Sequence, residues 1–330
     1  MRKLAILGLL ALLNTVVLAP RLAQAQNPTE IRLAVIPVLD TLPLFIAQEA
    51  GYFEEEGLTV ELIPVASPPE RDALIQAAEA DGMVTDIQGV GFFNEARTRV
   101  QVVYTTRVAL EDGPVFRILA APESGLRTPA DLEGVSIGVS ENTIIEYLTD
   151  RLLEAEGVAG YTTEAVPAIP VRFQLLMAGE LQAATLPDPL AQAAIEAGAV
   201  LIVDDTQFAE SEWSQSVLVF RAEFVQEQSE AVAAFIRAWD RAVQDLNADP
   251  EAYRAIFLEN VPVPETVQET YSIPPFPRGL ITSEAAWEDA MAWMLDNAIL
   301  DEAPTYADSV NPAFLPEIAP EPDTTPEPGS

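Results

Sequence analysis

The sequence contains no cysteine and no histidine, and its only lysine is Lys3. Beyond Lys3 the chain therefore cannot form a disulfide, a Ser-His-Asp triad, a Schiff base or an ordinary zinc site. Carboxylate chemistry and oxygen-ligated Ca²⁺ or Mg²⁺ remain possible. A secreted carboxylate hydrolase is the only enzyme class that these missing residue types leave open, and no catalytic residue, metal or cofactor is predicted.

Basic residues are also scarce. The chain of 330 residues has 52 acidic and 17 basic residues, and its formal net charge is −35. A charge this negative repels phosphate backbones and anionic membrane surfaces, which argues against nucleic acid and membranes as partners. The hydrophobic fraction of 49% is sufficient for a large core, in one large domain or in two lobes.

Residues 1–25 have the layout of a secretory signal peptide. Basic Arg2 and Lys3 precede an apolar run at 4–19, and the Ala-Gln-Ala at 23–25 is a small-x-small cleavage site. The apolar run is shorter than the roughly 20 residues that span a bilayer, and no later run is apolar enough to do so. The mature protein is therefore predicted to be soluble and either periplasmic or secreted, after cleavage near Ala25.

Short apolar runs alternate with amphipathic segments along most of the chain. Strands are predicted at 31–36, 58–65, 82–85, 100–107, 116–121, 135–139, 183–186, 200–203 and 217–220. Helices are predicted between them, among others at 44–50, 69–80 and 173–177, and in the last third at 230–247, 250–259 and 282–298. This order predicts an α/β protein with mostly parallel sheets in two lobes. Residues 316–330, rich in proline, acids and threonine, are predicted to be a disordered tail.

Four segments carry a resemblance to a known family: "PLFIAQEAGYFEEEGLTVEL", "RTPADLEGVSIGVSENTIIEYLTDRLLEAEGV", "LQAATLPDPLAQAAIEAGA" and "SEAVAAFIRAWDRAVQDLNADPEAY". The sequence resembles the periplasmic substrate-binding proteins of nitrate/sulfonate/taurine (NitT/TauT) ABC transporters, which are related to thiamine-pyrimidine precursor binding proteins. The resemblance implies the two-lobe type 2 periplasmic-binding-protein fold, with a hinge and an interlobe cleft. Lobe one would comprise residues 26–118 and 217–315, and lobe two residues 119–216.

The resemblance also implies a function. The protein would be a solute-binding protein, not an enzyme, that captures a small polar organic molecule or anion and delivers it to the permease subunits of an ABC importer. Candidate ligands are pyrimidines or other heterocycles, sulfonates and nitrate. The protein is expected to act as a monomer. The alternatives are the carboxylate hydrolase and a ligand-sensing module for a membrane partner.

The loops that follow the predicted strands are the candidate binding site, because open α/β sheets bind ligands at the carboxyl ends of their strands. The first loop offers Asp40 and Thr41 as hydrogen-bonding groups and Leu42 as a packing surface. The second loop offers Asp86 and Gln88. Both aspartates can instead cap the helices that follow them, which is an ordinary use of aspartate.

Three further loops contribute candidates. Ser140, Asn142 and Thr143 precede a helix whose free backbone N–H groups suit a carboxylate, a sulfonate or a ring carbonyl, although Ser140 or Thr143 can also cap it. Asp188 precedes a proline and is either a cap or a ligand contact. Trp213 lies next to a predicted hinge, where it can stack on a flat ligand or pack in the core.

Two arginines bear on the charge of the ligand. Arg107 and Arg117 flank the first predicted crossover between the lobes. Their guanidinium groups can bind an anionic ligand or can pair with some of the many acids. Because the candidate loops also supply several aspartates, the sequence leaves the charge of the ligand open. A neutral or amidine-bearing heterocycle, or a zwitterion, fits these loops at least as well as nitrate or a sulfonate.

Overall fold

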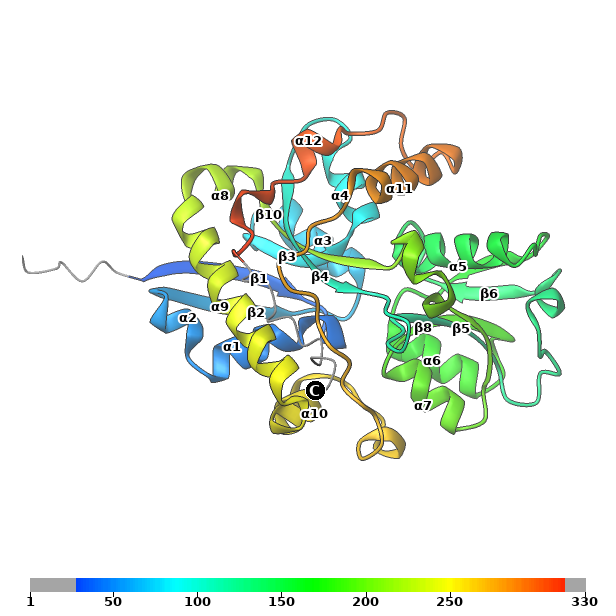
Figure 1. The fold of residues 1–330 in the computed structure, drawn as a ribbon. Helices are drawn as coiled ribbons and strands as arrows, with labels where there is room; N and C mark the ends of the chain where they lie inside the picture. The colour runs from blue at the N-terminus through cyan, green and yellow to red at the C-terminus, as the bar shows by residue number, and fades with distance from the viewer. Residues whose placement is uncertain (1–27, 318–330) are drawn as a thin grey trace, which may run out of the picture.

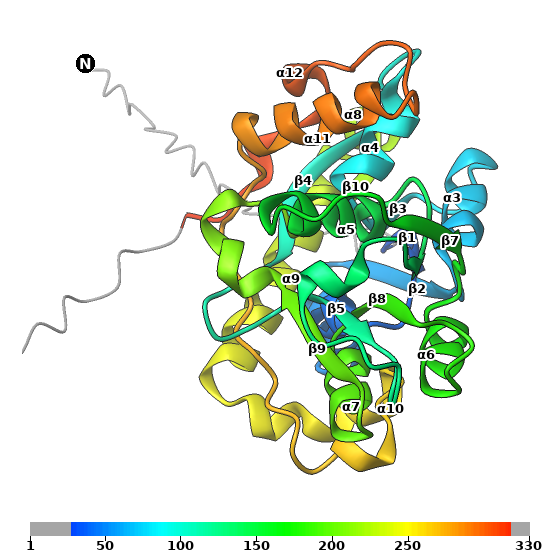
Figure 2. The ribbon, with the colours of Figure 1, turned by 90° about the vertical axis from the view of Figure 1, so that its right-hand side faces the viewer.

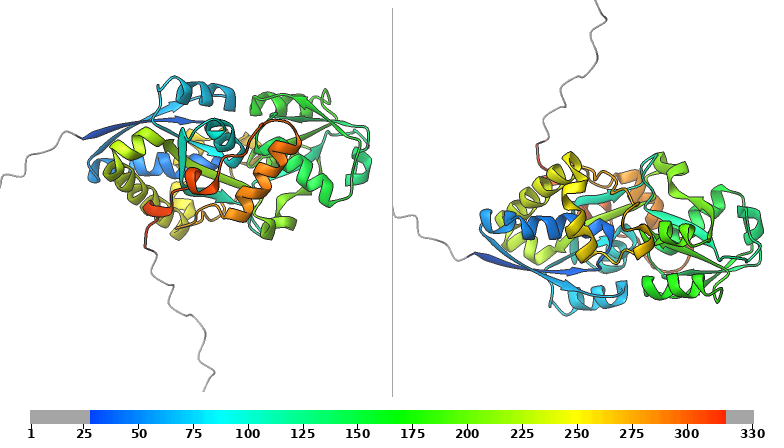
Figure 3. Two further views of the ribbon diagram at one scale, coloured as in Figure 1. Left: turned by 90° about the horizontal axis from the view of Figure 1, so that it is seen from above. Right: turned by 90° about the horizontal axis from the view of Figure 1, so that it is seen from below.

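The computed structural model describes residues 28–317, which form two α/β lobes lying side by side (Figure 1). The views from above and below show the same arrangement (Figure 3). The predicted signal peptide and nearly all of the predicted tail, at 1–27 and 318–330, lie outside the described residues. Each lobe is built around one five-stranded sheet, which confirms the predicted α/β class with two lobes.

The sheet of lobe one has the strand order β2-β1-β3-β10-β4. Its strands are β1 (Thr29–Val35), β2 (Leu58–Pro64), β3 (Gly82–Asp86), β4 (Val100–Val108) and β10 (Gln215–Arg221). β1 pairs in parallel with β2 and β3, whereas β10 runs antiparallel to both β3 and β4. Ala34 and Val35 are adjacent and both buried, which is typical of a strand that is covered on both faces.

The sheet of lobe two has the order β7-β6-β8-β5-β9 and repeats the arrangement of lobe one. Its strands are β5 (Phe116–Ala120), β6 (Ser136–Val139), β7 (Thr162–Ala165), β8 (Ala183–Pro187) and β9 (Val200–Asp204). β6 pairs in parallel with β7 and β8, and β5 runs antiparallel to β8 and β9. The fourth strand of each sheet, β10 or β5, is thus the one that the chain enters directly from the other lobe.

Lobe one carries helices from both ends of the chain. They are α1 (Leu42–Glu49), α2 (Tyr52–Glu55), α3 (Pro68–Gln76), α4 (Ile87–Asn94), α8 (Ala222–Glu227), α9 (Ser229–Ala248), α10 (Arg254–Asn260), α11 (Glu284–Asp296) and α12 (Tyr306–Ser309). Lobe two has α5 (Ile144–Ala155), α6 (Ile169–Met177) and α7 (Leu190–Glu196). Short 3-10 segments are formed by Leu39–Thr41, Pro129–Leu132, Asp205–Ser211, Pro250–Tyr253, Glu265–Val267 and Pro312–Phe314.

The long helix α9 holds the N-terminal helices of lobe one in place. Its buried face includes Phe235, which stacks on Phe53 of α2 with 4.9 Å between the ring centroids. On its exposed face, Nη2 of Arg237 lies 2.6 Å from Oε2 of Glu56. Exposed ion pairs contribute little to stability, so the buried aromatic contact carries most of this attachment.

The chain crosses between the lobes at residues 109–115 and 205–214 (Figure 1), and one buried carboxylate ties the two crossovers together. Asp205 accepts hydrogen bonds from the backbone N–H groups of Val115 (3.1 Å) and Phe116 (2.9 Å) and from Oγ of Ser214 (2.6 Å). Burial raises the pKa of Asp205 to about 6, although these hydrogen bonds favour the ionised form. Asp205 is not among the residues predicted from the sequence.

A few elements differ from the sequence prediction. α6 begins at Ile169 rather than at 173, because a proline is tolerated in the first turn of a helix. β7 and α8 are absent from the prediction, and β7 is a largely exposed edge strand without an apolar alternation. The predicted lobe boundaries at 118 and 216 pass through β5 and β10, which each lie in one sheet. Within residues 28–317, no helix has the length and apolar character needed to cross a membrane.

The raised pKa of Asp205 predicts that stability falls as the pH rises. The folded protein keeps this proton up to about pH 6, whereas the unfolded chain releases it near about pH 4. The free energy of unfolding should therefore fall by about 3 kcal/mol over this range through this one group, and it should stay lower at higher pH. Urea unfolding followed by circular dichroism at several pH values measures this slope.

We expect Asp205→Asn to remove that part of the slope, because the amide does not titrate. Asp112→Asn is the matched control, since Asp112 lies exposed in the first crossover. It should retain the slope of the wild type. Identical slopes for the wild type and Asp205→Asn would show that the proton is held elsewhere.

Candidate functional site

The carboxyl ends of the parallel strands in the two sheets face a common set of adjoining cavities between the lobes, which we call the interlobe cleft. The segments that line it are 36–38 after β1, 64–66 at the end of β2, 85–86 at the end of β3, 140–143 after β6 and 187–190 at the end of β8. This is the position at which open α/β sheets bind ligands.

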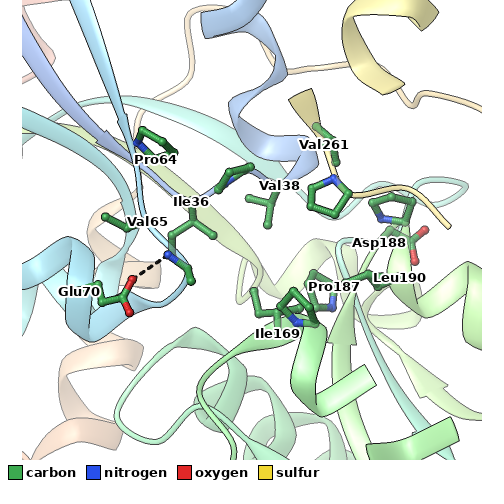
Figure 4. A pocket seen from close by; sticks show the side chains of 15 residues that line it. Ile36, Val38, Pro64, Val65, Glu70, Ile169, Pro187, Asp188, Leu190 and Val261 are labelled. Carbon is green, nitrogen blue, oxygen red and sulfur yellow. Dashed lines mark hydrogen bonds between the residues drawn. The ribbon is translucent and has the colours of Figure 1, made fainter. Parts of the chain in front are cut away.

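The largest cavity of the cleft measures about 460 Å³ and is mostly apolar (Figure 4). Lobe one contributes Ile36 and Val65 to its wall, and lobe two contributes Ile169. Most of the remaining lining is proline and aliphatic surface. The charged side chains among the described lining residues are both acidic, namely Glu70 and Asp188.

A smaller cavity, of about 70 Å³, shares Val38 with the large one. It brings together four of the predicted site residues: Asp40, Thr41 and Asp86 from lobe one, and Thr143 from lobe two. Organic ligands usually occupy roughly 300–1,000 Å³. With the lobes in this arrangement, the small cavity is therefore too small to hold such a ligand.

Asp40 does not cap the helix that follows it. Its Oδ2 accepts a hydrogen bond from Oγ of Ser216 (2.5 Å), and its Oδ1 lies 3.5 Å from Nε of the buried Arg107. Thr41 fixes the loop by donating a hydrogen bond from Oγ1 to the carbonyl oxygen of Val38 (2.8 Å). Of the two alternatives for Arg107, the structure thus shows pairing with an acid, but inside the protein rather than at its surface.

Asp86 caps α4 and lines a cavity that residues of lobe two also line. Its Oδ1 accepts a hydrogen bond from the backbone N–H of Gly89 (2.7 Å), which is the capping role that the sequence left open. Ile144, at the start of α5 in lobe two, lines the same small cavity as Asp86. Burial raises the pKa of Asp86, and the charge of Arg71 opposes that shift.

Ser140, Asn142 and Thr143 line a third cavity, of about 290 Å³, together with Asp86. Thr143 caps α5, because its Oγ1 accepts a hydrogen bond from the backbone N–H two residues further on. Ser140 Oγ accepts a hydrogen bond of 2.9 Å from Nη1 of Arg172. Asn142 is exposed and has a left-handed backbone conformation, with φ of 59°.

Arg172 is fully buried beneath this loop and bonds only neutral groups. Its Nε donates to the carbonyl oxygen of Thr185 (2.9 Å) and its Nη1 to that of Val166 (2.7 Å), while Nη2 has no partner among residues 28–317. Desolvation lowers the pKa of Arg172 to about 9, so the side chain stays charged at neutral pH. A lone arginine within the apolar segment "IPVRFQLLM" is the sequence signal that marks this residue.

Asp188 lies where the lobes meet and contacts residues of both lobes. Its Oδ2 accepts a hydrogen bond from Nη2 of Arg117 (2.7 Å) and lies 3.5 Å from the hydroxyl of Tyr271, in the C-terminal part of lobe one. The N-cap residue of α7 is Pro189 and no side chain caps this helix, so the predicted capping by Asp188 is not seen. Burial raises the pKa of Asp188, and Arg117 opposes that shift.

The remaining three candidates, Leu42, Gln88 and Trp213, line none of these three cavities. Leu42 is 0% exposed within the core of lobe one. Gln88 is 1% exposed on α4. Trp213 packs against Phe208, with 5.5 Å between the ring centroids. A ligand contact by Trp213 stays a prediction.

The residues that line the large cavity are mostly absent from the sequence prediction, which sought polar groups. The prolines at the strand ends are the sequence signal that could have identified these lining residues. Pro37 follows β1 closely, and Pro64 and Pro187 end β2 and β8. A proline cannot donate to the strand ladder, so it ends the pairing and leaves an apolar surface at the strand end. Within the described part of the chain, no group of three or more acidic side chains is placed to hold a metal ion.

Comparison with known proteins identifies the family. The family described as "NMT1/THI5 like" matches residues 39–253, more than half of the chain. The chain belongs to this family. The formylaminopyrimidine-binding protein of Halalkalibacterium halodurans is 24% identical over 290 residues, which cover 82% of this chain and 86% of that protein.

Solved structures share the fold. The alkanesulfonate-binding protein SsuA from Xanthomonas axonopodis pv. citri, bound to MOPS, has a TM-score of 0.73 at 17% identity and covers 87% of this chain and 99% of its own. A Candida albicans protein with the generic periplasmic binding protein fold has a TM-score of 0.69 at 16% identity, covering 89% and 99%. The resemblance stated from the sequence, and the two-lobe fold that it implied, are confirmed.

Outside the cleft, the lobes also touch through α5 and α11, which lie one above the other in Figure 2. Asp289 of α11 accepts hydrogen bonds from Nε (3.0 Å) and Nη2 (3.1 Å) of Arg151 and from the hydroxyl of Tyr147. Trp293 donates from Nε1 to Oδ2 of Asp150 (2.8 Å). We call these five residues the α5–α11 contact, and they hold the lobes together beside the cleft.

Removing Asp289 should let the lobes separate more readily. Asp289→Ala deletes the ion pair with Arg151 and the hydrogen bond with Tyr147, a partly exposed interaction worth about 1 kcal/mol. That loss changes the ratio of closed to open molecules about fivefold. We expect a larger radius of gyration in small-angle X-ray scattering from the ligand-free protein.

Asp296→Ala is the matched control, because Asp296 is an exposed aspartate at the end of the same helix. It should scatter like the wild type. If the curves of all three proteins superimpose, the α5–α11 contact does not set the spacing of the lobes.

Proposed function

We propose that this protein is an extracytoplasmic solute-binding protein that holds a small organic molecule in the interlobe cleft and delivers it to an ABC importer. The observation that carries the proposal is the cavity of about 460 Å³ at the strand ends, a volume within the usual range for ligand sites. The family and the fold support it. Export through a signal peptide at 1–25, action as a monomer and contact with permease subunits belong to the same proposal.

The lining of the large cavity favours a neutral or cationic ligand with an apolar body. Its charged groups are the carboxylates of Glu70 and Asp188. The arginines that flank the first crossover are already occupied, Arg107 by Asp40 and Arg117 by Asp188. Nitrate or a sulfonate would lose its hydration here without gaining a cationic partner. A pyrimidine or a similar heterocycle instead buries its faces against proline and aliphatic surface.

The names of the similar proteins bear on the ligand to different degrees. The Halalkalibacterium relative is named for binding a formylaminopyrimidine, and the alignment spans most of both chains. The sulfonate-binding protein shares the fold at 17% identity, which carries no information about the ligand of this chain. The relative and the chemistry of the cavity together support a nitrogen heterocycle over a sulfonate.

The carboxylate hydrolase that the composition leaves open gains no support from the two acids of the cavity. Glu70 accepts a hydrogen bond from the backbone N–H of Ala66 (2.9 Å) beside the start of α3. Asp188 is bonded to Arg117. Both carboxylates thus hold the structure together, whereas a glycosidase needs one acid that gives up a proton and a second that attacks or activates water.

A substitution that fills the cavity tests the proposed site. Val38→Trp places an indole where the ligand would lie, and it should weaken binding by on the order of tenfold or more. Val171→Trp is the matched control, because Val171 is an exposed residue on α6 outside the cavity. Thermal-shift titration with aminopyrimidines and, separately, with alkanesulfonates and nitrate provides the measurement, followed by calorimetry for any compound that stabilises the protein.

We expect aminopyrimidines to raise the melting temperature of the wild type and of Val171→Trp, but not that of Val38→Trp. Stabilisation by sulfonates or nitrate alone would reject the proposed ligand class. Equal stabilisation of the wild type and Val38→Trp would reject the site.

A further inference from the structure

A second, separate pocket lies on lobe one, at the end of the sheet that is remote from the cleft. It measures about 160 Å³, and Arg97, Arg99 and Arg221 contribute to its lining. Arg221 is the last residue of β10 and pairs with Val100, the first residue of β4. The opposite end of β10 reaches the cleft, where Ser216 bonds Asp40. We call this second site the arginine pocket.

Three arginines around one small pocket stand out in a chain with 17 basic and 52 acidic residues. Most arginines within residues 28–317 form an ion pair with an acid, but Arg97 and Arg99 do not. Arg221 contacts Asp81 (3.1 Å) and Glu223 (3.6 Å), yet its Nε is buried without a partner among the described residues. Positive charge is therefore in excess at this pocket.

Hydrogen bonds hold the backbone in place at Arg99 and next to Arg221. The side-chain oxygen of the buried Asn94 accepts hydrogen bonds from the backbone N–H groups of Arg99 (2.8 Å) and Val100 (3.0 Å). The backbone N–H of Ala222 donates to the carbonyl oxygen of Arg99 (2.8 Å). Phe93, which is buried, forms part of an apolar floor. Because the chain is already ordered here, binding has to immobilise only side chains.

We propose that the arginine pocket binds a small free oxyanion, such as phosphate or sulfate, independently of the ligand in the cleft. Guanidinium groups match the paired oxygens of these ions with two parallel hydrogen bonds. The pocket is smaller than the roughly 300 Å³ at which sites for organic ligands begin, so it suits an ion. Glu223 is the acid among its described lining residues, and its side chain is 77% exposed to solvent.

The charge of the whole protein favours a small ion over a larger anionic partner. The net charge of −35 opposes the approach of a polyanion or an anionic bilayer, which would meet many acids at once. At physiological salt, charges more than roughly 8 Å away are largely screened. An ion inside the pocket therefore responds mainly to the arginines that it touches.

Calorimetric titration of the protein with inorganic phosphate, and separately with sulfate, at constant ionic strength tests this proposal. We expect binding to the wild type and a loss of at least about fivefold in affinity for Arg97→Ala and for Arg99→Ala. Arg127→Ala is the matched control, because Arg127 is an exposed arginine of lobe two that forms no ion pair among the described residues and donates to the carbonyl oxygen of Leu126. It should bind phosphate like the wild type.

Arg99→Lys provides a second variant that keeps the charge but loses the planar guanidinium. Its affinity should lie between those of the wild type and Arg99→Ala. Equal phosphate affinity in all of these variants would overturn the proposal, as would the absence of binding to the wild type. Binding to phosphatidylglycerol vesicles without binding to free phosphate would also overturn it, because that result identifies a lipid headgroup as the ligand.

Discussion

Charge that is buried between the lobes needs polar partners within the protein, and this constraint shapes the cleft. Arg107 is 1% exposed and Asp188 is 5% exposed, and removing the partner of a buried ion costs several kcal/mol. Arg107 therefore lies against Asp40, and Arg117 against Asp188. The polar side chains that the strand-end loops contribute to these pairs are therefore already bonded within the protein. The surface that remains around the largest cavity is aliphatic and proline, which suits an apolar body better than a free anion.

The lobes are joined on several sides, which explains why the small cavity between them, lined by Asp40 and Asp86, measures only about 70 Å³. Asp205 ties the two crossovers together, Tyr271 reaches Asp188, and the α5–α11 contact lies beside the cleft. α11 is itself packed closely on α4 of lobe one: a Cβ atom at Gly91 would lie 2.7 Å from the methyl group of Met291. Opening by rotation about the crossovers therefore has to break polar contacts of α11 with α5, or carry α11 away from α4.

The sequence was sufficient to predict the fold, and it pointed to several residues that line the cleft. Buried strands are short apolar runs that alternate with helices along the chain, and this alternation predicted the two lobes. Asp40, Asp86 and Thr143, which the strand-end rule selected, line one cavity, because the rule depends on topology alone. Partners such as Asp289 for Arg151 could not be predicted, since their helices are far apart in the chain. The apolar cavity was not predicted for a different reason. A proline at a strand end was interpreted only as the end of the strand and not as part of a binding surface.

Buried charge lies on both sides of the cleft. Lobe two carries the buried Arg172, which bonds Ser140 but no acid among the described residues, and lobe one carries Asp86, which meets the N-terminus of α5 at Ile144. Ser140 and Asp86 line the same cavity. The positive end of the α5 dipole attracts the carboxylate of Asp86, which shares a cavity with Thr143 and Ile144, and this attraction favours closure even without a ligand. An anionic ligand at that helix terminus would compete with Asp86 and place two negative charges side by side. A neutral heterocycle leaves the attraction intact, so the closed arrangement and the proposed ligand class follow from the same buried groups.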